Sequence, residues 1–258
     1  MAELRADGQR VLVTAGASGI GRAIVDALAE AGARLHVCDV EEAALAAVRE
    51  AHPHAGATLA DVADEAAVDR LFAEVGRTLG GLDALVNNAG IAGPTAAIED
   101  VDPADWRRCL EVDLTGQFLC ARRAVPMLKA AGGGVMVNMS SAAGRHGYAF
   151  RTPYAAAKYG VIGLTESLAK ELGPHNITVN AILPGIVQGP RIEKVIRARA
   201  EQQGLSYAEM ERQYLEKVSL RRMVTAQEVA AMVLFLVSPL GRGVSGQSIG
   251  VCGNVETL

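Results

Sequence analysis

The sequence predicts an α/β protein with a doubly wound, parallel sheet of about seven strands. Short apolar runs rich in β-branched residues alternate with longer helix-prone segments along the chain. The first run leads directly into a glycine-rich turn and then into a helical pattern, at residues 11–21. Strands that alternate with helices pair in parallel through right-handed crossovers, so the alternation predicts one sheet with helices on both faces.

The expected strands are almost continuously apolar, as strands covered on both faces of a parallel sheet are. We expect them at residues 10–14, 34–39, 57–59, 84–87, 134–140, 178–183 and 248–252. The segments between them carry helical patterns, which predict helices at residues 19–31, 41–50, 64–79, 103–130, 152–172 and 226–238.

Residues 189–224 interrupt this alternation. The segment is charged and helix-prone, and no strand separates it from the next expected helix. A long insertion of this kind is more often functional than structureless, so we expect a helical substrate cap there. No change in composition marks a second domain, and residues 1–258 are expected to form a single domain that includes this cap.

The composition excludes several classes of protein. Hydrophobic residues make up 50% of the 258 residues and aromatic residues only 4%, which fits a closely packed helix-on-sheet core. A net charge of −4 argues against a nucleic-acid partner or an anionic membrane. No apolar run approaches the ~20 residues of a membrane span and no signal-peptide core is visible, so a cytoplasmic protein is expected.

The cysteines show no metal-ligand spacing, and no metal site is expected. They are Cys38, Cys109, Cys120 and Cys252. Cys38 and Cys252 lie in apolar strand-like runs, which indicates small buried hydrophobic side chains. A reducing compartment fits this usage.

The turn at residues 11–21 predicts a nucleotide site of the Rossmann type. Its glycines let the backbone approach a pyrophosphate, whose negative charge suits the N-terminus of the following helix. The strand before the turn and the helix after it make the pattern specific. The residues expected against the cofactor are Gly16, Ser18, Gly19, Ile20 and Gly21.

Asp39 ends the second expected strand and indicates which dinucleotide binds. A carboxylate at this place accepts hydrogen bonds from both adenosine ribose hydroxyls and repels a 2′-phosphate. Neither Ser18 nor the residues after Asp39 supply a cation that could hold such a phosphate. The sequence therefore predicts NAD rather than NADP. The alternative is that Asp39 only caps the next helix.

Ser141, Tyr154 and Lys158 form the candidate catalytic set. Tyr154 and Lys158 are four residues apart, so they are neighbours on one helix face. An ammonium ion beside a phenol favours the ionised phenol, which can then exchange a proton with an alcohol or carbonyl oxygen. The hydroxyl of Ser141 can hold the same oxygen. The alternative is a packed tyrosine beside a solvent-facing lysine, because the spacing alone is a weak motif.

Together these residues resemble the short-chain dehydrogenase/reductase family over nearly the whole chain. The matching segments occur in the family's order and with family-like spacing. They are residues 14–21, Asp61-Val62, Asn87-Asn88-Ala89-Gly90, Ser141, Tyr154 with Lys158, and Pro184-Gly185.

The resemblance implies a role for each matching position around the cofactor. Asp61 and Val62 would contact the adenine. Asn88, Ala89 and Gly90 would line the floor of the cofactor site.

The resemblance also implies how the reacting ring is held. Tyr154 would be the general acid/base, and Lys158 would bind the nicotinamide ribose. Backbone after Pro184-Gly185, near Val187, would hold the carboxamide.

The chain departs from the family pattern at several positions. Ala15 stands where the family has its first glycine, which is tolerable if its φ is negative. Asp113 replaces the helix asparagine of the proton relay, and we expect the relay to survive with an altered pH dependence. Gly189 replaces a threonine that contacts the carboxamide. Cys252 and Asn254 replace the usual Asp and Gly.

The substrate is expected to lie under the cap, near the loop that follows Ser141. The candidate substrate residues are His146, Tyr148, Arg151 and Arg191. A sharp hypothesis is that Arg191 or Arg151 binds an anionic group of the substrate. The alternative is that these charges belong to a solvated helix face.

The sequence thus predicts an oxidoreductase that transfers a hydride between NAD(H) and a secondary alcohol or ketone. One alternative is a carbonyl or 3-oxoacyl reductase that works mainly in the reducing direction. A non-catalytic NAD sensor is a second alternative, although it would not need all of Ser141, Tyr154 and Lys158. Helical segments 103–130 and 152–172 are apolar on more than one face, which predicts a homotetramer or homodimer.

Overall fold

A computed structural model describes residues 4–255 and confirms the expected fold class. Seven parallel strands form one sheet in the order β3-β2-β1-β4-β5-β6-β7. Their bounds are β1 Arg10–Thr14, β2 Arg34–Asp39, β3 Gly56–Leu59, β4 Ala84–Asn87, β5 Gly134–Met139, β6 Ile177–Pro184 and β7 Ser248–Val251.

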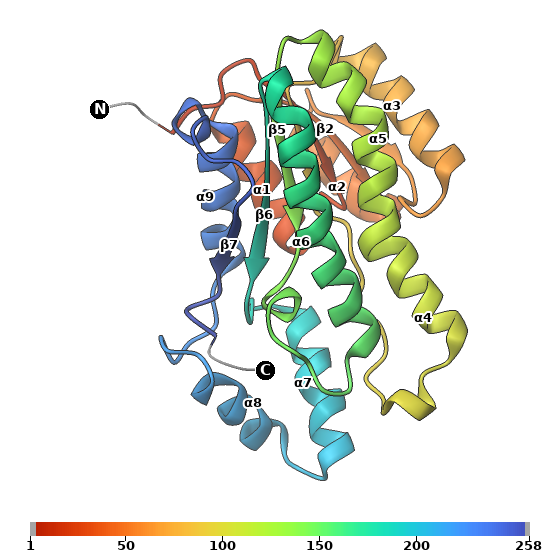
Figure 1. Cartoon of the computed structure of the whole chain (residues 1–258), viewed down its shortest axis with the longest axis vertical. Coiled ribbons are helices and arrows are strands. Elements are labelled where there is room, and N and C mark those ends of the chain that lie inside the picture. Colours follow the sequence, from red (N-terminus) through yellow and green to blue (C-terminus); the bar gives the residue numbers. More distant parts are fainter. Residues whose placement is uncertain (1–3, 256–258) are drawn as a thin grey trace.

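Nine α-helices are found among the described residues and connect these strands (Figure 1). They are α1 Gly19–Glu30, α2 Glu42–Ala51, α3 Glu65–Leu79, α4 Pro103–Leu110, α5 Gly116–Ala130, α6 Thr152–Leu172, α7 Pro190–Gln203, α8 Tyr207–Glu216 and α9 Ala226–Val237. The helix expected at residues 103–130 is divided, because a π-helical turn at Glu111–Thr115 joins α4 to α5.

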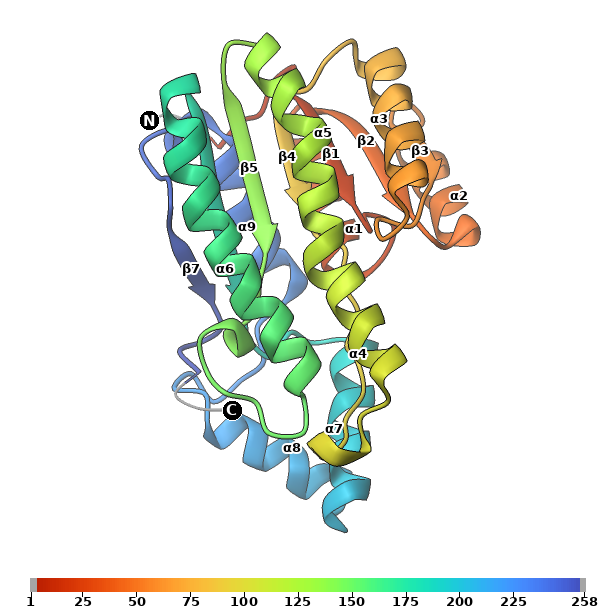
Figure 2. The same cartoon turned by 45° about the vertical axis from the view of Figure 1, so that its right-hand side comes forward.

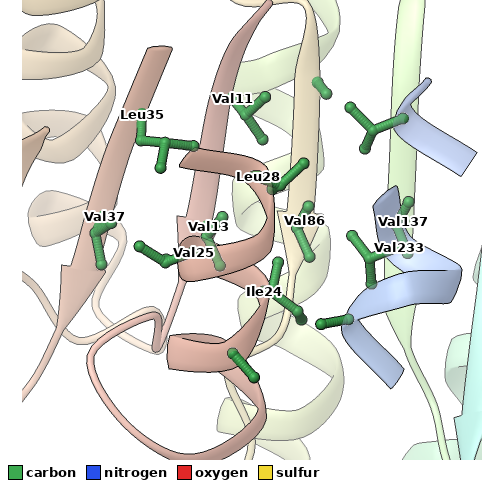
Figure 3. Packing of buried hydrophobic residues seen from close by; sticks show 14 of the residues in the cluster. Val11, Val13, Ile24, Val25, Leu28, Leu35, Val37, Val86, Val137 and Val233 are labelled. Carbon is green, nitrogen blue, oxygen red and sulfur yellow. The ribbon is translucent and has the colours of Figure 1, made fainter. Parts of the chain in front are cut away.

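Alternate side chains of each strand enter two separate cores. Val11 and Val13 of β1 pack with α1 and α9 on one face of the sheet, where Figure 3 shows Val13 beside Val25 of α1. Leu12 points to the other face and packs in the core formed with α3 and α5. This alternation explains why the strands read as continuous apolar runs, since neither face meets water.

The chain reverses its direction of travel across the sheet between β1 and β4. Strands β2 and β3 lie on one side of β1, and β4 to β7 lie on the other. In open α/β sheets ligands bind at such a switch point, beyond the carboxyl ends of the strands. The strand arrowheads point toward α7 and α8 in Figures 1 and 2, so the segment at residues 189–224 lies on this ligand-binding side.

The cap has a small core of its own. Ile196 of α7 and Met210 and Tyr214 of α8 pack with Ala142 and partly buried Tyr148, which follow β5. The expected insertion is therefore two helices resting on the loop that carries several candidate site residues.

Three of the four cysteines are buried, but Cys252 is only partly buried, so that expectation was wrong for Cys252. Across residues 4–255 no helix is long and apolar enough to span a membrane. The same residues contain no cluster of potential metal ligands.

Candidate active site

The turn between β1 and α1 leaves the first backbone N–H groups of α1 available. Ser18 is the N-cap residue, but its side chain makes no capping hydrogen bond. Gly19 has a φ of +53°, a conformation that favours glycine. At Gly21 a Cβ atom would meet the Ala15 carbonyl oxygen at 2.0 Å, so only glycine fits. Free N–H groups at a helix N-terminus are what a pyrophosphate requires, and the turn therefore fits a dinucleotide.

From the sequence, Ala15 is expected to be tolerated if its φ is negative. In the structure its φ is +47°, so the methyl group is in a strained, left-handed conformation. Asn88 stabilises this conformation, because its Nδ2 donates hydrogen bonds to the carbonyl oxygens of Thr14 (3.1 Å) and Ala15 (3.0 Å). The backbone N–H groups of Asn88 and Ala89 donate to Thr14 Oγ1 at 2.9 and 3.0 Å. Asn88 and Ala89 thus brace the turn from the end of β4.

Asp39 lies beside the turn, with 7% of its surface exposed. Its Oδ2 accepts a hydrogen bond from the Ala17 N–H (3.1 Å), and its Oδ1 accepts from the Val40 N–H (2.8 Å). The cap alternative was wrong, since the N-cap residue of α2 is Glu41. Within residues 4–255 no lysine or arginine forms an ion pair with this carboxylate.

Asp61 and Val62 follow β3. Partial burial raises the pKa of the Asp61 carboxyl, but hydrogen bonds from the Ala63 N–H and from Arg108 outweigh burial and lower it. The Arg108 contact measures 2.7 Å. Val62 is buried against Gly116, where a Cβ atom would meet its Cγ2 at 2.7 Å.

The candidate catalytic residues meet where β5 ends and α6 begins. Ser141 follows β5, and its Oγ accepts a hydrogen bond from the Ala143 N–H at 3.2 Å. Tyr154 lies in the first turn of α6 and is partly buried. Lys158 is buried one turn later, with its Nζ 5.6 Å from the Tyr154 ring centroid. Lys158 therefore does not face solvent, which removes the alternative for this pair.

Backbone contacts hold Lys158 in place. Its Nζ donates to the carbonyl oxygen of Met139, the last residue of β5, at 3.1 Å. Ser140 Oγ donates to the Lys158 carbonyl oxygen at 2.7 Å. These two bonds tie the end of β5 to α6, so the ammonium group has one defined position beside the tyrosine ring.

Asp113 lies in the π-helical turn and is fully buried. Its Oδ1 accepts a hydrogen bond from the Ile91 N–H (2.6 Å), and its Oδ2 lies 3.9 Å from Lys158 Nζ. A Cβ atom at Gly90 would meet Asp113 Oδ1 at 2.8 Å, so glycine is needed between the two elements. Single π-turns often occur at functional sites, and this one directs a carboxylate at the candidate catalytic lysine.

Comparison with known proteins agrees with this geometry. A family model described as "Enoyl-(Acyl carrier protein) reductase" matches residues 14–254. A sorbitol dehydrogenase from Cereibacter sphaeroides is 36% identical, with 97% of this chain and 98% of the relative covered. A cis-4-hydroxycyclohexanecarboxylate dehydrogenase from Sinomonas cyclohexanicum is 38% identical, with 96% of each covered.

The chain belongs to the short-chain dehydrogenase/reductase family.

A solved structure of an NAD+-bound xylitol dehydrogenase superimposes with a TM-score of 0.92 at 29% identity, covering 98% of this chain and 100% of that one. The protein is therefore an oxidoreductase that acts on an alcohol or ketone group of a small-molecule substrate. Its cofactor is a nicotinamide dinucleotide.

The family's Pro-Gly segment lies at the end of β6 in this short-chain dehydrogenase/reductase. A Cβ atom at Gly185 would meet Cys252 Cα at 2.7 Å, so Gly185 allows the chain after β7 to pack closely. Val187 forms an isolated bridge with Val224, which closes the base of the cap. Gly189 has a φ of +144° and precedes α7, a conformation that threonine would adopt only with strain.

The two unusual residues after β7 have different surroundings. Cys252 packs against Gly185, and burial there is incomplete. Asn254 has a φ of +58° and its Nδ2 donates to Ser219 Oγ at 2.7 Å, at the foot of the cap. Asparagine tolerates this left-handed conformation better than other side chains, which explains why the usual glycine is replaceable here.

The structure separates the four candidate substrate residues. Arg151 is buried against the Tyr148 and Tyr154 rings, whose centroids lie 5.2 and 4.9 Å from its Cζ. Arg191 is exposed, and its Nη1 donates to the Gly90 carbonyl oxygen at 3.0 Å. His146 is partly buried in the loop after Ser141. Arg191 thus links the cap to the end of β4, whereas Arg151 and Tyr148 lie on the Tyr154 side.

The sequence did not indicate three residues on the cap side of the site, two of which contact Tyr148. Its hydroxyl lies 2.6 Å from the Tyr214 hydroxyl, and burial raises the pKa of Tyr148 far above its usual value. Arg199 lies over the ring of Tyr148, with 5.6 Å to the centroid. Burial, followed by repulsion from Arg199, lowers the pKa of Lys217. The excess of basic residues in the cap was the only signal in the sequence.

Proposed function

We propose that this short-chain dehydrogenase/reductase oxidises a secondary alcohol, or reduces the matching ketone, with NAD(H) as its cofactor. The observation that carries the proposal is the position of Tyr154 beside a buried, backbone-anchored Lys158 at the carboxyl edge of the sheet. A lysine held this way favours the ionised phenol when a proton is to be accepted.

Residues of the turn and of the strand ends support the dinucleotide. The N–H groups of α1 after Ser18 suit the pyrophosphate, and Asp39 suits the adenosine ribose. Lys158 suits the nicotinamide ribose, and the backbone near Val187 suits the carboxamide. When bound, the cofactor supplies the hydride acceptor or donor.

The protein's own part in the reaction is proton transfer and orientation. Tyr154 would take the proton from the substrate hydroxyl during oxidation and return it during reduction. Ser141 Oγ would donate a hydrogen bond to the same oxygen. Asp113 would act through Lys158, because it contacts that ammonium group and the backbone of Ile91 rather than the reacting centre.

NAD is proposed over NADP because of Asp39. Its carboxylate is nearly buried and has no cationic partner within the described part of the chain. A 2′-phosphate would have to approach that negative charge without a compensating lysine or arginine. This argument concerns the adenosine end only and is independent of the substrate.

The direct test is absorbance at 340 nm with purified protein, NAD+ or NADP+, and a panel of secondary alcohols. The proposal predicts NADH formation with at least one alcohol and much weaker reduction of NADP+. Equal use of both dinucleotides would remove the assignment of NAD. Cofactor binding without turnover of any alcohol or ketone would favour a non-catalytic sensor.

A 3-oxoacyl reductase is the second candidate. A 3-oxoacyl-[acyl-carrier-protein] reductase from Thermotoga maritima is 34% identical over 98% of this chain, which supports a carrier-bound thioester as substrate. The two candidates differ in the direction of the reaction and in whether the substrate is a free alcohol or is attached to a carrier through a thioester. Reduction of a 3-oxoacyl thioester that is faster than oxidation of every free alcohol would favour the reductase.

We also propose that the protein forms a homodimer or homotetramer. Phe118 of α5 and Tyr159 of α6 are each 47% exposed although they are large and hydrophobic. Such residues on the two helices with extra apolar surface support a homodimer or homotetramer. Light scattering after gel filtration tests this, since Phe118→Glu should release smaller species. A cytoplasmic location and a single catalytic domain of residues 1–258 are proposed with it.

A further inference from the structure

The cap side of the site contains cations that lack a carboxylate partner among the described residues. Arg151, Arg199 and Lys217 form no ion pair within residues 4–255. Two cations of the cap do have partners, since Arg212 pairs with Glu216 and Arg222 pairs with Glu228. The unpaired cations that concern the site are the ones near the rings of Tyr148 and Tyr154. We call Arg151, Arg199 and Lys217 the cationic row.

Arg151 is the most deeply placed member of the row, with 3% of its surface exposed. One Nη donates to the Ala92 carbonyl oxygen at 2.5 Å, but its buried Nε has no hydrogen-bond partner. A buried guanidinium without a carboxylate is unfavourable unless a ligand supplies the missing charge. The contacts of Arg151 with the Tyr154 and Tyr148 rings place this positive charge next to the candidate catalytic tyrosine.

Arg199 and Lys217 extend the row into the cap. Arg199 lies over the Tyr148 and Phe150 rings, and its Nη1 donates to the Ala149 carbonyl oxygen at 2.9 Å. Lys217 is close enough to Arg199 for their repulsion to lower the pKa of Lys217, in addition to burial. Lys217 thus adds positive charge near Arg199, and neither residue pairs with a carboxylate among the described residues.

The row is continuous with the site of proton transfer. Tyr154 contacts Arg151, Arg151 contacts Tyr148, and Tyr148 contacts Arg199. The Tyr148 and Tyr214 hydroxyls bond to each other, which fixes the ring between the two guanidinium groups. A substrate whose alcohol carbon is at Tyr154 can therefore extend along this row toward the cap.

We propose that the substrate is a hydroxy- or oxo-carboxylate whose carboxylate is bound by Arg199, with Arg151 supplying positive potential between it and Tyr154. This inference rests on the proposed function and names the substrate class of the same site. The sequence suggested Arg191 or Arg151 for the anionic group. Arg151 keeps a supporting part in this proposal, whereas Arg191 is left out because it is tied to Gly90 after β4. The row runs away from Tyr154, so several atoms separate the carboxylate from the reacting carbon.

The test compares each hydroxy acid with its methyl ester. Suitable pairs are 3-hydroxybutyrate, 4-hydroxycyclohexanecarboxylate and a longer hydroxy fatty acid, each with its ester, at 0.05 and 0.5 M salt. The proposal predicts a higher kcat/KM for the acid, by about 10- to 100-fold in the best pair. It also predicts that the longer spacers are preferred to 3-hydroxybutyrate and that added salt reduces the preference for the acid.

Single substitutions test which side chain causes the preference for the acid. Arg199→Ala should raise the KM of the acid about tenfold or more, with kcat and the ester's KM nearly unchanged. Arg199→Lys should restore part of the loss. The matched control is Arg197→Ala, which removes one positive charge from the same helix, α7. The Arg197 side chain lies over the Tyr207 ring, with 5.4 Å to the centroid, and not over Tyr148. Calorimetric binding of cyclohexanecarboxylate to wild type and to Arg199→Ala gives a readout that needs no turnover.

The outcomes separate this inference from the proposed function. Equal rates for acids and esters, with no selective effect of Arg199→Ala, overturn the carboxylate site and leave the alcohol oxidation intact. A dependence on Arg199 that occurs only with coenzyme A thioesters also overturns it, because the anion would then be a carrier phosphate. If no alcohol or ketone of either kind reacts, the proposed function fails first.

Discussion

At the carboxyl ends of the strands, the region that would hold the cofactor and the region under the cap differ in how their charged groups are paired. We call these regions the cofactor side and the cap side. On the cofactor side, Asp39 accepts hydrogen bonds from backbone N–H groups, and Asp61 pairs with Arg108. On the cap side, Arg151 and Arg199 lie over the Tyr148 ring and neither forms an ion pair with a carboxylate among the described residues. The cofactor side is thus largely satisfied by the protein itself, whereas the cap side depends on a ligand for its missing negative charge.

This difference indicates which parts of the chain determine cofactor binding and which determine substrate binding. Cofactor residues sit on strand ends and in one tight turn, so nearby backbone positions them. The cap residues come from α7, from the end of α8 and from the loop after Ser141, and only tertiary packing brings them together. Substitutions should therefore separate cofactor binding, proton transfer and substrate choice.

Tyr154→Phe should have the largest effect, because it removes the proton carrier between the two sides. We expect kcat to fall by about 10²- to 10⁴-fold, with NAD+ affinity and melting temperature nearly unchanged. Steady-state rates and calorimetric NAD+ binding measure this. Tyr159→Phe is the control on the same helix, since its hydroxyl only donates to the Arg145 carbonyl oxygen. Comparable losses in both variants would contradict the assignment.

Asp39→Ala should weaken the cofactor side alone. Loss of hydrogen bonds from a charged group predicts a Kd for NAD+ that rises about 10- to 100-fold, while the affinity for NADP+ falls much less. Glu41→Ala, a neighbouring exposed carboxylate, is the control. Titration calorimetry with both dinucleotides decides the question, and unchanged discrimination would mean that Asp39 does not select the ribose.

His36 of β2, in the half of the sheet that carries Asp39, makes the stability of the fold sensitive to acid. Burial lowers the pKa of His36 to about 4, and its ring nitrogens contact Thr78 and Thr58. Since the unfolded state takes up a proton near pH 6.5, this contribution to stability is complete above that pH and declines as the pH falls toward 4. Between pH 7 and pH 5 the loss should be about 2 kcal/mol.

Urea unfolding at the two pH values measures this loss. His36→Gln should remove that part of the pH dependence, even if the variant is less stable at pH 7. His146→Gln, in the loop on the cap side, is the control and should keep it. Parallel pH dependences for wild type and His36→Gln would show that the proton is taken up elsewhere.

Asp113→Asn tests whether the carboxylate next to Lys158 influences proton transfer by Tyr154. Removing the negative charge next to Lys158 strengthens the effect of the ammonium group on Tyr154, so the pH–rate profile should move toward lower pH. The expected displacement is up to about one pH unit, or roughly 1 kcal/mol. The measurement is kcat/KM from pH 5 to pH 10, and an unchanged profile would mean that Asp113 has no influence on proton transfer.

Ala15→Gly should have the smallest effect and the opposite sign. Relief of the left-handed strain at φ +47° outweighs the added flexibility of glycine by about 0.5–1 kcal/mol, which raises the melting temperature by roughly 1–4 °C. Asn254→Gly, at φ +58° beside the cap, is the comparison and should change stability less. A destabilised Ala15→Gly variant would show that the methyl group packs favourably in the turn.

Residue patterns within short segments of the sequence predict much of this fold. The seven strands, the turn before α1 and the helical spacing of Tyr154 and Lys158 depend on residues close together in sequence, and the structure places each as predicted. The strand ends differ by at most one residue, because strand termini depend on contacts that periodicity does not encode.

The remaining features depend on distant contacts. The π-helical turn is coupled to the hydrogen bond between Asp113 and Ile91, two residues on different elements. The positive φ of Ala15 is stabilised by Asn88, from the end of β4. The exposure of Cys252 and the approach of Lys217 to Arg199 likewise follow from how the cap rests on the sheet. No local pattern signals any of these.

The central claim is that Tyr154 and Lys158 serve an oxidation of a secondary alcohol by bound NAD+. A single-turnover experiment tests it most directly, with enzyme in excess over an alcohol substrate that is either protiated or deuterated at the carbinol carbon. The account predicts one NADH per alcohol, formed more slowly from the deuterated substrate, and almost none with Tyr154→Phe although that variant still binds NAD+. Bound NAD+ that no alcohol reduces, or equal NADH formation by Tyr154→Phe, would contradict it.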